Sequence, residues 1–187
     1  MKKVYLDNAS TTAMRPEVIQ VMVDCMAQDY GNPSSTHSLG RHAKSILELS
    51  RKSIAKALNA TAQEILFTSG GTEANNWILR SAVKDLKVRR IISSKMEHHA
   101  VLYPILELQK EFDIQVEYVE NSADGVLDLT HLVDLLSEST EKTLVSLMHV
   151  NNETGVVLDL ERVSQICQEH HALFHSDTVQ SVGKAIL

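Results

Sequence analysis

The sequence is poor in cysteine, in aromatic residues and in positive charge, and each shortage argues against a class of protein. Cys25 and Cys167 are its only two cysteines among 187 residues. They show no Cys-x-x-Cys spacing, so we expect two small buried thiols on helix faces rather than a disulfide, a redox pair or a metal site. Aromatic residues make up 4% of the chain and the net charge is −6. This balance argues against a nucleic-acid binder that relies on phosphate neutralisation.

Long apolar runs are also missing. No stretch approaches the roughly 20 residues that cross a bilayer. The N-terminus carries Lys2, Lys3 and Asp7, which interrupt it before a signal-peptide core could form. We therefore expect a cytoplasmic protein with no membrane contact. With 43% hydrophobic and 22% charged residues, the composition is that of a globular protein of about one domain.

Helix and strand patterns alternate along most of the chain. A short strand is expected at 4–6, and two helices at about 16–26 and 38–58. Further strands are expected at 65–69, 90–93, 115–119, 143–148 and 173–176, separated by helices at 72–86, 101–111, 129–136 and 159–171. This order predicts an α/β fold with a mostly parallel sheet and helices on both faces.

Polar motifs follow four of the five later strands. Ligands of open α/β sheets bind outside the carboxyl ends of the strands. The four motifs are Gly70-Gly71-Thr72, Glu97-His98-His99, Asn151-Asn152, and Asp177 with Gln180. Together they indicate a cofactor that carries both a phosphate and a ring.

Gly71 and Thr72 are suited to the phosphate. The two glycines let the backbone approach a ligand closely, and the start of the next helix offers free N–H groups. An ordinary capped turn between strand and helix would explain the same residues. The spaced glycines of nucleotide P-loops and of dinucleotide sites are absent.

His98 is suited to the ring, because an imidazole can stack on it or move protons near neutral pH. A solvent-exposed loop histidine is the alternative. His170, His171 and His175 do not complete a zinc ligand set, so we expect no metal.

Asn152 and Asp177 have similar alternatives. An asparagine after a strand can bond a ligand or simply form a turn. A carboxylate at the end of a buried strand needs a partner, such as a protonated pyridine nitrogen, although Asp177 could instead cap the following helix. The details favour pyridoxal 5′-phosphate.

These motifs give the chain a family resemblance from end to end. It resembles the pyridoxal-phosphate-dependent cysteine desulfurases of the NifS/IscS type, in the class V aminotransferase group. The matching segments are residues 5–12 (YLDNASTT), 31–37 (GNPSSTH), 67–73 (FTSGGTE), 94–98 (SKMEH), 148–156 (MHVNNETGV) and 177–184 (DTVQSVGK).

The resemblance implies a fold-type I large domain over 16–187, with residues 1–15 belonging to a small domain. It implies that Gly71 and Thr72 hold the phosphate and that His98 stacks on the ring and transfers protons. Asn152 would lie near the ring hydroxyl and the substrate, Asp177 would pair with the ring nitrogen, and Gln180 would bond the ring hydroxyl.

The family reaction converts L-cysteine to L-alanine and an enzyme persulfide. The sulfur then passes to an iron–sulfur scaffold or another acceptor protein, for cluster assembly or tRNA thiolation. The resemblance also implies a homodimer.

The sequence departs from the family in what it does not contain. The family's Schiff-base lysine lies in a Ser-Gly-His-Lys setting, followed later by the substrate-binding arginine and the persulfide cysteine. None of these matches a position here, and Lys184, Cys25 and Cys167 are not their equivalents. We therefore expect the first half of such an enzyme, inactive alone.

Two other interpretations stay open at this point. The first is a related pyridoxal-phosphate enzyme, such as a selenocysteine lyase or an aminotransferase. The second is a non-catalytic half-protein that acts as a binding module.

Overall fold

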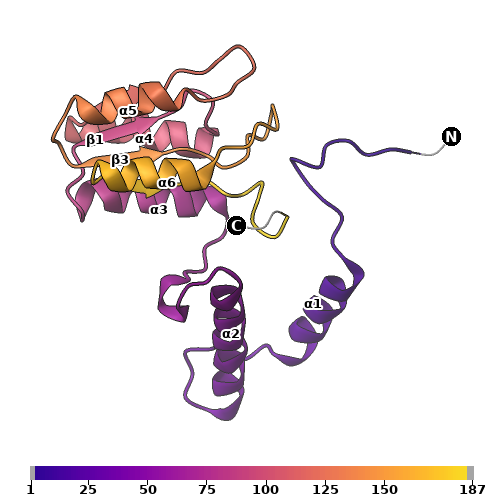
Figure 1. Ribbon diagram of the computed structural model, residues 1–187. Helices are drawn as coiled ribbons and strands as arrows, with labels where there is room; N and C mark the ends of the chain where they lie inside the picture. Colours follow the sequence, from indigo (N-terminus) through magenta and orange to yellow (C-terminus); the bar gives the residue numbers. More distant parts are fainter. Residues whose placement is uncertain (1–2, 185–187) are drawn as a thin grey trace. The chain divides into compact units, whose positions relative to one another are not determined.

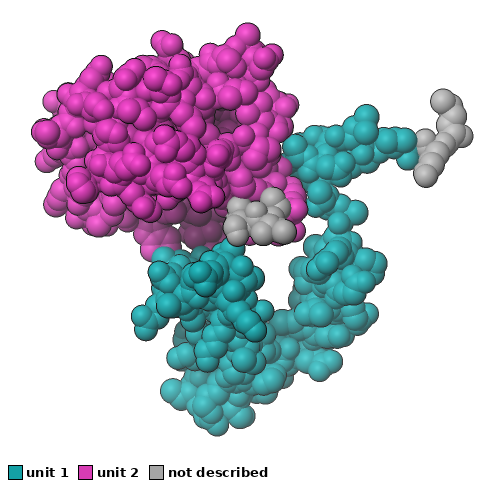
Figure 2. Space-filling model, in the orientation of Figure 1, with its two compact units in different colours: residues 1–67 teal, residues 68–187 magenta. Residues whose placement is uncertain are grey.

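The structure is a computed structural model that describes residues 3–184. It divides into two compact units, Met1–Phe67 and Thr68–Leu187, coloured separately in Figure 2. The expected division at residue 15 between a small and a large domain concerns the whole protein and stays a prediction.

The first unit contains two helices and a short 3-10 turn (Figure 1). Helix α1 (Pro16–Gln28) starts with proline at its first position, where the missing N–H costs nothing. Helix α2 (Ser38–Ala57) is capped by His37, whose Nδ1 accepts a hydrogen bond from the Gly40 N–H at 3.3 Å. The turn η1 (Ala62–Glu64) follows it.

The loop at 31–37 packs tightly against the start of α2. A Cβ added to Gly31 would lie 2.4 Å from the Leu39 carbonyl oxygen, and one added to Gly40 would lie 2.4 Å from that of Ser35. Because backbone atoms cannot move aside cheaply, both positions require glycine in this structure.

Two expectations for this unit are wrong. Residues 4–6 form no strand, and their side chains are exposed. Cys25 is only half-buried, and no residue of α1 is buried.

The second unit is built on a four-stranded parallel sheet with the order β2-β1-β3-β4. The strands are β1 (Arg90–Ser93), β2 (Gln115–Tyr118), β3 (Thr143–Ser146) and β4 (Leu173–His175). The helices are α3 (Gly71–Lys84), α4 (His99–Phe112), α5 (Leu129–Ser137) and α6 (Leu160–Glu169). The α/β fold with a parallel sheet is thus confirmed.

The sheet is covered on both faces because successive strand residues point to opposite sides. Ile91 and Leu144 belong to the core cluster that contains residues of α3 and α4. Their neighbours Ile92 and Val145 belong to the other cluster, with residues of α5 and α6. Cys167 lies in that second cluster and is 1% exposed, as expected.

The expected strand at 65–69 is wrong. These residues form no strand in the structure. A β-strand needs a hydrogen-bonded neighbour, and none of the described strands pairs with this segment.

Candidate cofactor site

The candidate site lies at the carboxyl edge of the sheet. Strands β1, β3 and β4 are adjacent in the sheet, and they are followed by His98, Asn152 and Asp177 respectively. Parallel strands end at the same edge, so the sheet gathers these three segments although up to 79 residues separate them along the printed sequence.

Asp177 is the most firmly held of these residues. It is 8% exposed. Its Oδ2 accepts a hydrogen bond from Asn75 Nδ2 at 2.7 Å, and its Oδ1 accepts one from the Val179 N–H at 3.0 Å. The second bond is the local turn expected of an aspartate after a strand. The first bond reaches another element, so local turn formation alone does not account for this buried carboxylate.

The start of α3 lies against the segment after Asp177. A Cβ on Gly71 would come within 2.5 Å of Val179 Cγ2, so only glycine avoids displacing that side chain. Gly70 is the N-cap, which places Thr72 inside the first turn and not at the cap position. The Thr72 hydroxyl makes no hydrogen bond to any described residue, and the same holds for the N–H groups of Gly71 and Thr72. A helix start with free donors is suited to an anion.

His98 is the N-cap of α4, which begins at His99, two residues before the expected start. His98 Nδ1 accepts a hydrogen bond from the Ala100 N–H at 3.1 Å. The bond fixes the tautomer of the neutral ring, so Nε2 carries the proton. The side chain is exposed, as a ligand-stacking ring requires before its ligand binds.

The two asparagines after β3 divide the expected roles between them. Asn151 is buried and forms the turn: its Oδ1 accepts hydrogen bonds from the Glu153 and Thr154 N–H groups, both at 2.9 Å. Its Nδ2 donates to the Met96 carbonyl at 2.8 Å. Asn152 is half-buried and donates only to Glu153 Oε1, at 2.8 Å. The turn interpretation therefore applies to Asn151 and leaves Asn152 available to a ligand.

Gln180 lies in the turn after Asp177. Its Oε1 accepts a hydrogen bond from Lys184 Nζ at 3.2 Å. The roles of Gln180 and Asn152 towards a ring hydroxyl stay predictions.

Glu97 is a functional candidate that belongs to a motif named from the sequence but was given no role of its own there. It is 6% exposed, and its Oε1 accepts a hydrogen bond from the Met148 N–H at 2.7 Å. Burial raises the pKa of Glu97 to about 8; the bond from Met148 opposes that rise and the charge of Asp177 adds to it. Glu97 is therefore a neutral acid at pH 7.

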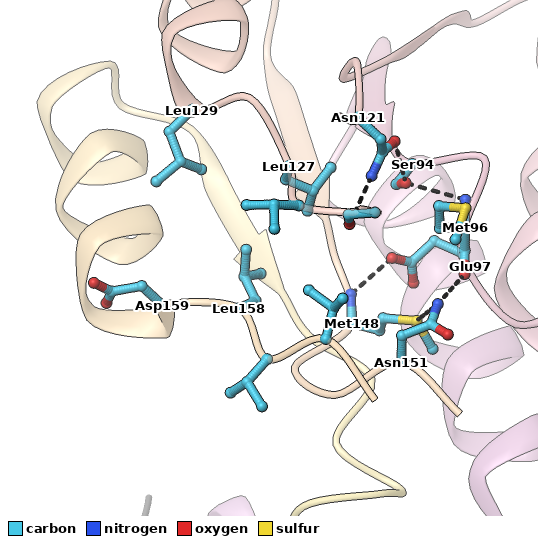
Figure 3. Close-up of a pocket in the computed structure, with 14 residues that line it drawn as sticks. Ser94, Met96, Glu97, Asn121, Leu127, Leu129, Met148, Asn151, Leu158 and Asp159 are labelled. Carbon is cyan, nitrogen blue, oxygen red and sulfur yellow. Dashed lines mark hydrogen bonds between the residues drawn. The ribbon is translucent and has the colours of Figure 1, made fainter. Parts of the chain in front are cut away.

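Glu97 and Asn151 also tie the segments after β1 and β3 together. Figure 3 shows both side chains reaching across to the neighbouring segment beside Met148. They border a pocket of about 170 Å³ whose other walls are mostly apolar, including Leu127, Leu129 and Leu158. None of the six residues assigned to the cofactor from the sequence lines this pocket.

Asn75 was also missed from the sequence. It lies within helix α3, one turn after Gly71, where nothing in the local pattern distinguishes it from Asn76 beside it. Only the tertiary structure shows that Asn75 faces the segment after β4. Glu97 had a weak signal, an acidic residue just after a buried strand.

Two negative findings apply to the described residues, 3–184. No group of three or more histidine, cysteine, aspartate or glutamate side chains there is arranged to hold a metal ion. No helix there is long and apolar enough to cross a membrane.

Comparison with known proteins gives consistent results. The family model described as aminotransferase class-V matches residues 4–187. Proteins named cysteine desulfurase IscS from Dictyoglomus turgidum and Haemophilus ducreyi are 41% and 42% identical. Each match covers 97% of this chain, but only 46% and 45% of the relative. The chain thus spans about half the length of the curated relatives it matches, as expected.

Solved structures agree with this. A NifS-like protein superposes with a TM-score of 0.93 at 36% identity, over all of this chain and 51% of that one. The apo structure of a cysteine desulfurase from Thermococcus onnurineus gives a TM-score of 0.87 at 28% identity, over 96% and 45% of the two chains. The fold is therefore that of a NifS-like large domain, and the chain belongs to the class V aminotransferase family.

Proposed function

We propose that this chain forms the cofactor-holding part of a pyridoxal-phosphate-dependent cysteine desulfurase. The observation that carries the proposal is the buried carboxylate of Asp177, held at the carboxyl end of β4 beside the open start of α3. The matched relatives are named cysteine desulfurases, so neither of the other two interpretations is favoured.

The residues present fit the cofactor. The free N–H groups and the Thr72 hydroxyl at the start of α3 suit a phosphate. A buried carboxylate suits a protonated pyridine nitrogen, because burying it without a positive partner is costly. The exposed ring of His98 suits stacking against an aromatic face.

Each residue then has a defined role. Gly71 and Thr72 bind the phosphate, and Asp177 holds the proton on the ring nitrogen. Gln180 bonds the ring hydroxyl, which orients the ring, and Asn152 lies near that hydroxyl and the substrate. His98 stacks on the ring and moves a proton at Nε2, the nitrogen left free by its bond to Ala100. When bound, pyridoxal phosphate supplies an electron sink for charge that develops on the substrate α-carbon.

The substrate under this proposal is L-cysteine and the products are L-alanine and a protein-bound persulfide sulfur. The sulfur would pass to an iron–sulfur scaffold or another acceptor protein. A homodimer and a cytoplasmic location belong to the same proposal.

The test uses the complete natural protein that contains this chain. Its intact mass is measured after borohydride reduction, and L-alanine is measured after incubation with L-cysteine. We expect a mass above 20.8 kDa that includes a reduced pyridoxal-phosphate adduct, together with alanine formation. A protein without adduct or alanine would refute the proposal.

A further inference from the structure

Asn75 makes a hydrogen bond that connects two parts of the candidate site. It lies on α3 and is 4% exposed. Its Nδ2 donates to Asp177 Oδ2 at 2.7 Å, across 102 residues of sequence. A hydrogen bond from an amide to a carboxylate is charge-assisted, and both of these partners are buried.

This bond is the side-chain contact that fixes how the carboxylate is turned. The Val179 N–H also bonds Asp177, but it belongs to the same turn and moves with it. Among the described residues, Asn75 is the donor that reaches the Asp177 carboxylate from another element. Each carboxylate oxygen accepts one of these two bonds and keeps a lone pair free for a ligand.

The same helix carries the expected phosphate site. Gly71 starts α3 in contact with Val179, and Asn75 follows one turn later on the same side. Contacts at both Gly71 and Asn75 hold the first turn of α3 against the segment that follows β4. The phosphate-binding donors and the acceptor for the ring nitrogen are therefore fixed relative to each other.

We propose that Asn75 is a positioning residue, which holds the Asp177 carboxylate in the orientation that accepts the ring nitrogen of the cofactor. The inference rests on the proposed function. It predicts that loss of the Asn75 amide weakens binding only of ligands that have this nitrogen.

Two probes separate this role from a structural one. The first is pyridoxamine 5′-phosphate, which has the phosphate, ring nitrogen and ring hydroxyl but no aldehyde to react with lysines. The second is its 1-deaza analogue, in which carbon replaces the ring nitrogen. Affinities for both are measured by calorimetry on the complete natural protein freed of cofactor.

The variants are Asn75→Leu, Asn75→Ala, Asp177→Ala and, as the matched control, Asn76→Ala. Asn76 is the neighbouring asparagine on α3, and its side chain bonds only the Thr72 carbonyl. Thermal unfolding verifies that each variant is folded, and Asn75→Ala replaces Asn75→Leu if leucine prevents folding.

We expect Asn75→Leu to bind pyridoxamine phosphate about tenfold more weakly, which is the effect of one hydrogen bond to a charged group. Its affinity for the deaza analogue should stay within about twofold of the parent. Asp177→Ala should show the same pattern more strongly, and Asn76→Ala should bind both probes like the parent.

Two kinds of failure are distinguishable. If the Asn75 variants bind both probes normally, or lose both equally, while Asp177→Ala loses only the first, the positioning role is wrong and the proposed function stands. If the parent binds neither probe, or Asp177→Ala binds both normally, the proposed cofactor site itself is wrong.

Discussion

Glu97 and the backbone of Met148 form a buried hydrogen bond of 2.7 Å between the ends of two neighbouring strands. Its acceptor is a carboxyl group whose other oxygen, Oε2, is buried and has no hydrogen-bond partner in the described structure. A charged carboxylate would be costly there, so the group keeps its proton at neutral pH. The neighbouring carboxylate of Asp177 differs in that each of its oxygens accepts a hydrogen bond.

The raised pKa of Glu97 predicts a pH-dependent stability. Between its usual value of 4.5 and about 8, folded Glu97 keeps a proton that the unfolded chain releases. Because the folded state binds more protons, stability falls as pH rises through this window and levels off above it. Between pH 5 and pH 8 the free energy of unfolding of the parent should fall by roughly 3 kcal/mol more than that of Glu97→Gln, because glutamine cannot ionise.

Urea unfolding at pH 5, 6.5 and 8 measures the effect. Trp77 is the single tryptophan and lies on α3, so its fluorescence reports on the second unit. The two proteins are compared by the slope of their free energy of unfolding against pH. The absolute values are not compared, because the buried amide of glutamine adds a cost that does not depend on pH. Equal slopes for parent and variant would show that Glu97 is ionised when folded.

Asn151 and Asn152 provide a matched pair for stability. Asn151→Ala removes two hydrogen bonds within the turn after β3 and one, to the Met96 carbonyl, that joins this turn to the segment after β1. We expect it to lower the free energy of unfolding by about 2–3 kcal/mol. Asn152 makes one hydrogen bond to a neighbouring side chain. Asn152→Ala should therefore change the free energy of unfolding by less than about 0.5 kcal/mol.

Chemical denaturation of the two variants under the same conditions checks this assignment. If Asn152→Ala were the more damaging change, the turn role would belong to Asn152 and its availability to a ligand would be lost.

The sequence predicted the second unit far better than the first. Strands such as 90–93 and 143–148 are short apolar runs between turns, and a parallel sheet with helices on both faces follows from their alternation with helices. The segments at 4–6 and 65–69 have similar local patterns but no neighbouring strand to pair with, and local pattern does not report pairing.

The candidate site was predictable only where its residues follow strands. Asp177 and His98 were found in that way, because the carboxyl edge of a parallel sheet is known from topology alone. Asn75 lies inside a helix, and its partner is 102 residues away. Arg90 is similar: it lies in β1 and is 2% exposed, paired with Glu117 and the Leu135 carbonyl, and no local rule places a buried charge there.

The two cysteines should differ in reactivity. Cys167 lies in the core, where burial raises the pKa of its thiol to about 11. Cys25 is half-buried on α1. Because the thiolate is the reactive form, we expect a disulfide reagent such as Ellman's to modify Cys25 in the folded 187-residue chain and Cys167 only after unfolding.

Absorbance of the released thiolate measures this reaction. Cys25→Ser should abolish the native signal and leave one thiol in denaturant, whereas Cys167→Ser should leave the native signal unchanged. Rapid native modification of Cys167 would mean that the second core cluster opens readily, and would make that thiol a candidate sulfur carrier.

The 187-residue chain by itself should not catalyse the formation of L-alanine from L-cysteine. Its sequence contains no Ser-Gly-His-Lys motif, and Cys167 is too deeply buried to take part in sulfur transfer. The residues that it does contain can hold and orient a cofactor, but none of them matches the family's Schiff-base lysine. We expect alanine formation at the background rate of free pyridoxal phosphate, with the complete natural protein as the positive control. Sustained turnover by purified material of 20.8 kDa would show that another lysine of this chain has taken over the anchoring role.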